Sequence, residues 1–223
     1  MNNSLIISKM LVAITGLMMV GFILGHTAAN TLVFLGPDLG RDLLNAYAAG
    51  LKQTPLLLWG ARITLIAAVL IHIVLTIKLT MLNKAAKPIN YKVKNTKRAN
   101  FASQGMTLFG LVILFFLVYH LLHYTLGVTN PEFMNMVDHQ GRHDVYAMMV
   151  EGFSHPLISL FYVLGVVSLG FHLKHGIQSM VHTLGFNGTK LSQTTNKISN
   201  LLSIVITLLL AFIPISILLG LVK

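Results

Sequence analysis

Five long apolar stretches alternate with short polar links along the chain. They cover residues 10–34, 56–82, 105–127, 156–182 and 201–222. Each is long enough for an α-helix to cross a bilayer, which takes about 20 residues. We therefore predict an all-α fold, a polytopic membrane protein with a five-transmembrane-helix bundle that forms a single domain over residues 1–223. In the first link, apolar residues recur at helical spacing and predict a short amphipathic helix: Leu39, Leu43, Leu44, Tyr47 and Leu51.

Composition supports the membrane class. The chain is 55% hydrophobic and only 10% charged, whereas soluble domains carry about 25% charged residues. A water-soluble enzyme and a disordered chain are therefore excluded. The chain contains no cysteine, which excludes disulfides, thiolate metal sites and iron–sulfur ligation by its own residues.

Charge is distributed unevenly between the links. The links between the second and third stretches and between the fourth and fifth are basic and contain no acid. All six acids lie in the other two links: Asp38, Asp42, Glu132, Asp138, Asp144 and Glu151. The positive-inside rule then predicts a cytoplasmic N-terminus and an outside C-terminus. This topology accounts for the net charge of +10, so no nucleic-acid partner is expected.

Histidines are the informative polar residues of the apolar stretches. Six of the ten lie there: His26, His72, His120, His123, His172 and His175. Ionisable groups are costly inside a membrane and often functional. At 1.5 Å per residue, His26 and His120 lie about 25 Å from the cytoplasmic side. His72 and His172 lie about 24 Å from the outer side by the same measure. The spacing predicts two histidine pairs at two depths.

Paired imidazoles from facing helices suit the two axial positions of a haem iron. Zinc is less suited, because it prefers more ligands and the apolar stretches contain no Cys, Asp or Glu. A proton relay or transporter usually adds an intramembrane carboxylate. We favour haem and keep a histidine-lined transporter and a structural scaffold as alternatives.

Five fragments in order carry a family resemblance. They are TGLMMVGFILGHTAAN around His26, LLWGARI before His72, VYHLLHYTLG around His120, GFSHPLISLFYVLG, and FHLKHGIQSMVHTLG around His172. Over essentially its full length the chain resembles the single-chain, two-haem cytochrome b membrane anchor of succinate:quinone oxidoreductases, that is, of succinate dehydrogenases and fumarate reductases.

The resemblance implies two haem b groups in the bacterial cytoplasmic membrane. His72 and His172 would ligate the iron of the proximal haem, and His26 and His120 that of the distal haem. A flavoprotein subunit and an iron–sulfur subunit would dock on the cytoplasmic face, where the basic link 84–98 lies, and carry the succinate or fumarate chemistry. Electrons would pass between the iron–sulfur clusters and a membrane quinone, usually menaquinone. A cytochrome b subunit of another quinone-linked oxidoreductase is the alternative, although such subunits distribute their histidines differently.

Other polar residues are weaker candidates for contacts with the haems. His123 and His175 lie one turn beyond His120 and His172 and are expected beside the haems, with service as alternative ligands as the other possibility. Arg62 is expected to bind a distal haem propionate or to snorkel to the interface. Asn30 lies one turn after His26 and could form a hydrogen bond nearby.

The quinone site is expected on the outer side, in the segment before the fourth apolar stretch. A quinone needs an apolar slot and groups that handle protons. The candidates are Arg142, Asp144, Tyr146 and Glu151, with an ion-paired solvated loop as the alternative. Some fumarate reductases of the family carry a glutamate two residues before the fourth-helix ligand. Gly170 stands there in this chain, so the proton path linked to that glutamate is not expected.

Overall fold

The computed structural model describes residues 3–86, 105–186 and 188–223. These residues are helical, apart from loops and one isolated bridge between Val137 and His143. Five helical segments are long and apolar enough to cross a membrane: Ser4–Leu35, Pro55–Ala85, Met106–Thr125, Pro156–Thr183 and Thr189–Leu218. The predicted all-helical, multi-pass class is thereby confirmed. Most of the basic link 84–98 lies outside the described residues.

The spanning segments are built from α1 (Asn3–Asn30) with the 3₁₀ turn η1 (Thr31–Leu35), α3 (Pro55–Ala85), α5 (Met106–His120) with the π-helix η2 (Leu121–Thr125), α7 (Pro156–Thr183) and α8 (Thr189–Leu218). Pro55 and Pro156 open their helices at the position where a missing amide hydrogen costs least. The fifth helix begins at Thr189 rather than at residue 201. Its first turns are polar, and hydropathy marks where a helix enters apolar surroundings, not where it begins.

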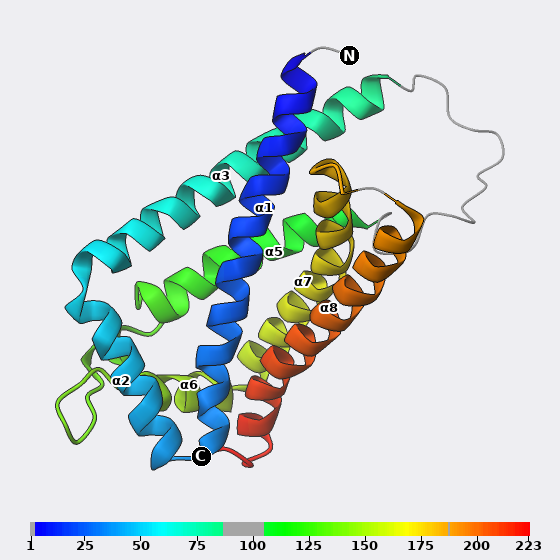
Figure 1. Ribbon diagram of the computed structural model, residues 1–223. Helices are drawn as coiled ribbons and strands as arrows, with labels where there is room; N and C mark the ends of the chain where they lie inside the picture. The colour runs from blue at the N-terminus through cyan, green and yellow to red at the C-terminus, as the bar shows by residue number, and fades with distance from the viewer. Residues whose placement is uncertain (1–2, 87–104, 187) are drawn as a thin grey trace.

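The spanning helices pack mainly in pairs (Figure 1). α1 packs on α3, α5 on α7, and α7 on α8, while α1 also contacts α7 and α8. The α7–α8 contact uses small residues, which let membrane helices approach closely. A Cβ on Gly170 would collide with the Thr207 hydroxyl of α8. Gly170 is therefore needed for packing.

A cap of shorter helices closes one end of the bundle. It consists of α2 (Leu39–Gln53), the 3₁₀ turn η3 (Pro131–Asn135) and α6 (Val145–Ser154), and the C-terminus lies with them (Figure 1). α2 confirms the short helix predicted in the first link. It buries Gly40, Leu44 and Asn45 and leaves Leu39 and Tyr47 exposed. α6 was not predicted. Its N-cap, Asp144, accepts a hydrogen bond from the Ala147 amide.

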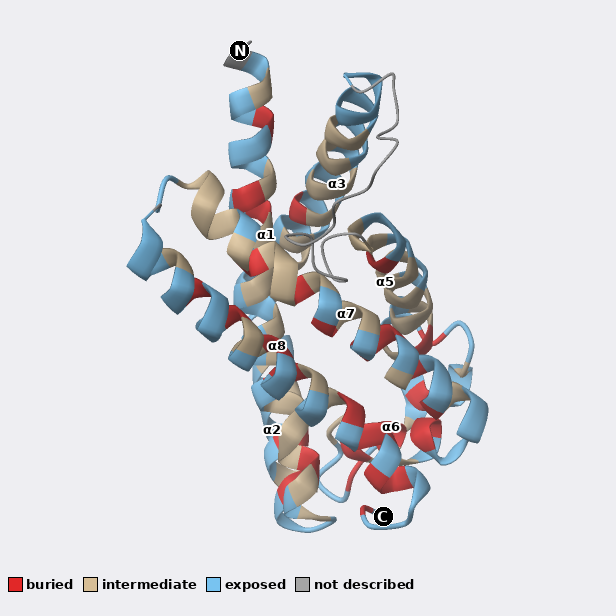
Figure 2. Cartoon of the chain, turned by 90° about the vertical axis from the view of Figure 1, so that its right-hand side faces the viewer, coloured by how far each residue is buried: buried red, intermediate tan, exposed pale blue. Residues whose placement is uncertain are grey.

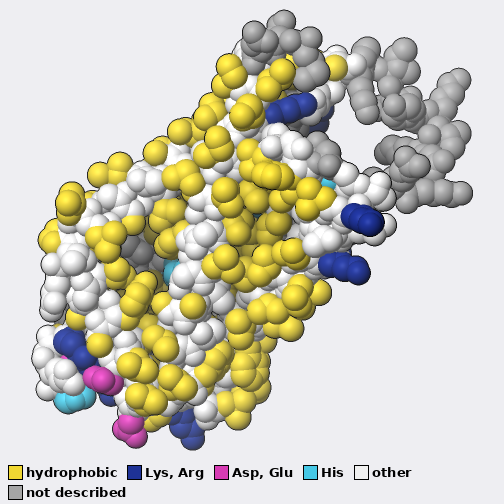
Figure 3. Space-filling model, in the orientation of Figure 1, with side chains coloured by type: hydrophobic (Ala, Val, Ile, Leu, Met, Phe, Trp, Pro, Cys, Tyr) yellow, Lys and Arg dark blue, Asp and Glu magenta, His cyan; other side chains and the backbone are white. Residues whose placement is uncertain are grey.

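Burial is concentrated near the cap. Figure 2 shows buried residues gathered in α6 and the neighbouring parts of the bundle. In contrast, Ala68 is the one buried residue of α3 within the described part of the chain. Hydrophobic side chains cover most of the face seen in Figure 3, and the acidic side chains visible there gather at the cap end. Such an apolar surface matches lipid rather than water.

Candidate functional site

Two of the predicted histidines pack against glycines. A Cβ on Gly16 of α1 would lie 3.6 Å from His72 Cε1 of α3, and a Cβ on Gly110 of α5 would lie 3.6 Å from His172 Cε1 of α7. The glycines leave room for each ring between the paired helices. We call this group the His72–His172 level.

The other two predicted histidines face each other directly. The ring centroids of His26 and His120 are 5.9 Å apart, and the ring planes meet at 88°. Each follows the glycine of its own helix, Gly16 or Gly110, by ten residues, which is about 15 Å along a helix axis. The His26–His120 level therefore lies about three helical turns from the His72–His172 level.

The two histidines of each level come from different helix pairs. His26 and His72 belong to the α1–α3 pair, and His120 and His172 to the α5–α7 pair. α1 with α5 and α3 with α7 are not among the main helix contacts of the described residues. At the His26–His120 level, imidazoles from α1 and α5 therefore meet without close packing of the two helices that carry them.

Thr15 is a hydrogen-bond partner of His72. Its Oγ1 donates to the Leu11 carbonyl oxygen over 2.8 Å and lies 3.1 Å from His72 Nδ1. A hydroxyl has one hydrogen, so with that hydrogen on Leu11 the oxygen accepts from His72 Nδ1. The lone pair of His72 is then on Nε2. This is how metal-binding histidines are commonly held.

The donor set fits a metal with two imidazole ligands rather than a multi-ligand ion site. No group of three or more His, Cys, Asp or Glu residues in the described chain could hold a metal ion. A metal–imidazole bond is about 2 Å long, so the centroids of two opposed ligand rings are about 6 Å apart. The 5.9 Å separation of His26 and His120 agrees with this. The His26–His120 pair therefore has the separation that a bis-histidine haem iron needs, and no group of the described residues suits zinc.

The residues expected beside the haems differ in their surroundings. His123 is fully buried and pairs with the Tyr162 hydroxyl. His175 lines a surface cavity of about 680 Å³ that also includes Lys9 and His182, between the first turns of α1 and the end of α7. Asn30 donates to the His26 carbonyl oxygen over 2.7 Å.

Arg62 contacts an aromatic ring. Its guanidinium carbon lies 5.2 Å from the Trp59 ring centroid, a cation–π distance. Within the described residues it makes no ion pair with a carboxylate. Its expected role with a propionate stays a prediction.

Three of the four quinone candidates are held in the cap. Arg142 pairs with Asp138 at 2.7 Å and with Asp42 at 2.8 Å. Asp144 pairs with Arg41, and the Tyr146 hydroxyl donates to the Lys223 carbonyl oxygen over 3.0 Å. We call the set joined by these ion pairs and by the hydrogen bonds of Asn45 the cap network: Arg41, Asp42, Asn45, Asp138, Arg142 and Asp144. Glu151 is exposed and outside it. This geometry matches the alternative of an ion-paired loop, and the quinone role stays a prediction.

The network controls the ionisation of its carboxylates. Burial alone would raise the pKa of Asp144, but hydrogen bonds from Arg41, Asn45 and the Ala147 amide outweigh it and lower that pKa. Burial opposes ionisation of Asp138 in the same way, and bonds from Arg142 and Asn45 hold its pKa well below the usual value. Both carboxylates are therefore charged acceptors that join α2 to the segment before α6.

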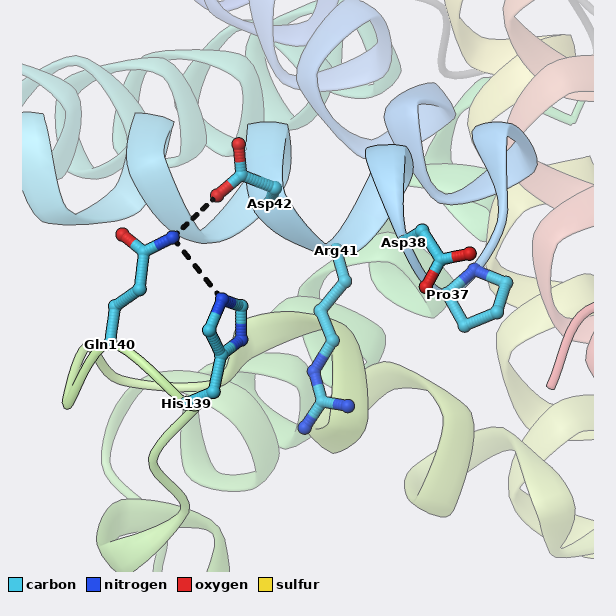
Figure 4. A pocket seen from close by; sticks show the side chains of 6 residues that line it. All are labelled: Pro37, Asp38, Arg41, Asp42, His139 and Gln140. Atoms are coloured by element: carbon cyan, nitrogen blue, oxygen red, sulfur yellow. Dashed lines mark hydrogen bonds between the residues drawn. The ribbon is translucent and has the colours of Figure 1, made fainter.

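A small hollow adjoins the cap network. It has a volume of about 370 Å³ and is lined by Pro37, Asp38, Arg41, Asp42, His139 and Gln140 (Figure 4). Gln140 Nε2 donates to Asp42 Oδ1 over 3.2 Å, and Arg41 points away from that pair. Pro37 is the one apolar side chain of this lining, so the hollow does not suit a quinone, which needs an apolar slot.

Sequence reasoning missed several residues that contact the histidines, among them Gly16, Gly110, Thr15 and Tyr162. The glycines had a signal, because the spacing of ten residues from glycine to histidine occurs in both α1 and α5. The two hydroxyls had none, since their contacts depend on how the helices pack.

Comparison with protein-family models, curated proteins and solved structures found no match. The helices define the class, a multi-pass membrane protein with five candidate spans in the described residues.

Proposed function

We propose that the chain is the dihaem cytochrome b membrane anchor of a succinate:quinone oxidoreductase. The observation that supports the proposal is the arrangement of four imidazoles, one from each of four spanning helices, at two levels about 15 Å apart along the bundle, with His26 and His120 in ring contact. A transporter or a scaffold has no need for two such pairs. The motif resemblance supports the same conclusion.

The residues have distinct tasks in this proposal. His26 and His120 hold one haem iron, and His72 and His172 hold the other. Each haem supplies a one-electron carrier that changes oxidation state without binding substrate. Gly16 and Gly110 make room for the rings at the His72–His172 level, and Thr15 holds a proton on His72 Nδ1. The exposed apolar side chains of α3 face lipid.

The remaining subunits dock at the end of the bundle opposite the cap. That end carries Lys9, Lys84 and Lys190, and under the positive-inside rule it is cytoplasmic. A flavoprotein and an iron–sulfur subunit there perform the succinate or fumarate chemistry. A membrane quinone reacts at the end nearer the His26–His120 level. Menaquinone is the favoured species by resemblance.

The test is a pyridine haemochrome assay with a reduced-minus-oxidised spectrum on the complex purified through this chain. We expect two haem b per chain and a co-purifying flavoprotein with succinate dehydrogenase or fumarate reductase activity. Two haems with a hydrogenase or formate dehydrogenase instead would assign the chain to another quinone-linked enzyme. A folded, freshly prepared sample without haem would contradict the proposal and favour the transporter.

A further inference from the structure

One phenol oxygen lies between two histidines at the His26–His120 level. Tyr162 Oη of α7 is 3.3 Å from His120 Nδ1 and 3.0 Å from His123 Nδ1. The Tyr162 ring centroid is 5.8 Å from each imidazole centroid. The tyrosine is itself buried. A single hydroxyl thus connects a proposed iron ligand with a second imidazole.

The hydrogen count at this oxygen gives the connection a direction. A phenol has one hydrogen to donate and can accept others. It can donate to only one of the two Nδ1 atoms, so the other imidazole must donate to it. If His120 binds iron through Nε2, as the proposed function requires, its Nδ1 carries the hydrogen. Tyr162 then accepts from His120 and donates to His123.

The state of His123 agrees with this direction. A His123 that accepts at Nδ1 carries its own hydrogen on Nε2. That Nε2 is buried and has no hydrogen-bond partner among the described residues, so Tyr162 is the one polar contact that orients the ring. Buried polar groups normally have partners. An apolar side chain would be less costly to bury at this place than a histidine with an unpaired nitrogen. The bond to Tyr162 is therefore the reason we infer for a histidine here.

The backbone around His123 forms a π-turn. The π-helix η2 begins directly after His120, with the Leu126 amide donating to the Leu121 carbonyl oxygen over 2.8 Å. η2 ends this spanning segment, and π-turns are common at helix C-termini. Gly152 of α6 packs on this segment, since a Cβ there would lie 3.2 Å from His123 Cε1. The cap thereby holds His123 in position.

We propose that Tyr162 is a positioning residue for His120, anchored by His123, and that this chain of hydrogen bonds sets the orientation and basicity of the His120 ring at the His26–His120 level. The proposal rests on haem ligation by His120. A bond accepted from the far nitrogen of a metal-bound histidine raises the basicity of the ligand. It therefore favours ferric iron and lowers the reduction potential of that haem.

The test is a redox titration of the haem α-band, with electron paramagnetic resonance of the ferric haems, in the purified complex. Tyr162→Phe keeps the ring and removes the hydroxyl. We expect the potential of one haem to rise, by about tenfold in its reduction equilibrium, or about 59 mV for a one-electron couple. The haem that shifts must be the one missing from His26→Ala. Its ferric resonance should move, and that of the other haem should not.

Tyr124→Phe is the matched control. The Tyr124 ring centroid lies 5.9 Å from that of His120, but its hydroxyl is buried without a hydrogen-bond partner in the described residues. It should leave both potentials unchanged. His123→Leu should give a smaller rise than Tyr162→Phe, because Tyr162 still accepts from His120, and His123→Asn should restore part of it by offering an acceptor.

The outcomes separate this inference from the proposed function. A wild-type chain without haem would contradict both. Two haems with unchanged potentials in Tyr162→Phe, or equal shifts in Tyr124→Phe, would overturn the inference alone. Loss of the haem at the His26–His120 level in Tyr162→Phe would support it, as a stronger form of the same effect. Loss of both haems would overturn it by assigning Tyr162 to the fold of the bundle.

Discussion

The two histidine levels use the same donors in different surroundings. Aromatic rings surround the His26–His120 level, and its Tyr162 belongs to the buried cluster that includes Leu44, Tyr146 and Phe153 of the cap. The His72–His172 level has a glycine beside each imidazole and one threonine hydroxyl. Identical ligands on unequal supports should bind two chemically similar haems that differ in potential and in lability.

The support also differs in mechanical terms. α3, which carries His72, has Ala68 as its one buried residue in the described chain, whereas His123 and Tyr162 at the His26–His120 level are buried, and Tyr162 packs in the core cluster of the cap. Local stability follows buried contacts and hydrogen bonds. Changes in the cap should therefore affect the His26–His120 level first, and changes on the paired glycines should affect the other.

The largest effect is expected from removing one ligand. His120→Ala should lower the haem content from two per chain to one, with the His72–His172 haem retained, because an iron that loses an axial imidazole loses its anchor at that level. His172→Ala should remove the His72–His172 haem and spare the other. His26→Ala should behave like His120→Ala, and His72→Ala like His172→Ala. Haem content and the residual spectrum check this. Loss of both haems from a normally inserted single variant would contradict the pairing.

Enlarging a glycine should weaken one level selectively. Gly110→Leu places a branched side chain where His172 lies, and overpacking costs about 1–3 kcal/mol, roughly tenfold in haem retention. Gly110→Ala is the control, since its Cβ would lie 3.6 Å from His172 Cε1, an ordinary contact. Haem content after dilution in detergent measures the difference. Equal loss in both variants, or loss at the other level, would refute the assignment of Gly110.

The cap network should matter for stability rather than for ligation. Asp144→Asn removes the ion pair with Arg41 and weakens the cap of α6, so we expect a loss of about 2 kcal/mol, the scale of a hydrogen bond to a charged group. Glu151→Gln is the control, because Glu151 is exposed and its carboxylate forms no ion pair within the described residues. Thermal unfolding in detergent should separate the two variants.

Low pH should destabilise the cap by protonating Asp144. The folded-state pKa of Asp144 is lowered, so its contribution is complete above the ordinary value, about pH 4, and is lost as the pH falls through the folded value. The wild type should lose cap stability below about pH 4, with the His26–His120 haem released before the other. Asp144→Asn should reduce this dependence and leave the part that Asp138 contributes, because the pKa of Asp138 is lowered as well. An unchanged acid profile would show that other groups control it.

Sequence reasoning was most successful where one chemical constraint acts along a single helix. Apolar length predicted the five spans, and residue counting from the span ends suggested the two histidine depths. It missed α6, whose ten residues are too few for a clear periodic signal, and the polar start of α8 at Thr189. The contacts of Thr15 and Tyr162 cross between helices, so they follow from packing angles that a linear pattern does not contain.

The smallest expected effect is at Thr15, which tests whether each level has its own hydroxyl. Thr15→Val keeps the shape and removes the acceptor for His72 Nδ1–H. The potential of the His72–His172 haem should rise for the same reason as with Tyr162→Phe, but by less, because Thr15 donates to a backbone carbonyl of its own helix, whereas Tyr162 is bonded to a second imidazole. We expect about a threefold change in the reduction equilibrium. This is less than the roughly tenfold effect that is typical when a residue bonded to a metal ligand is removed. Thr15→Ser should restore the wild-type value. Thr15 lies on the helix of His26 but contacts His72. A shift in the potential of the His26–His120 haem would therefore contradict the assignment of Thr15 to the His72–His172 level. A general loss of stability would not produce such a selective shift.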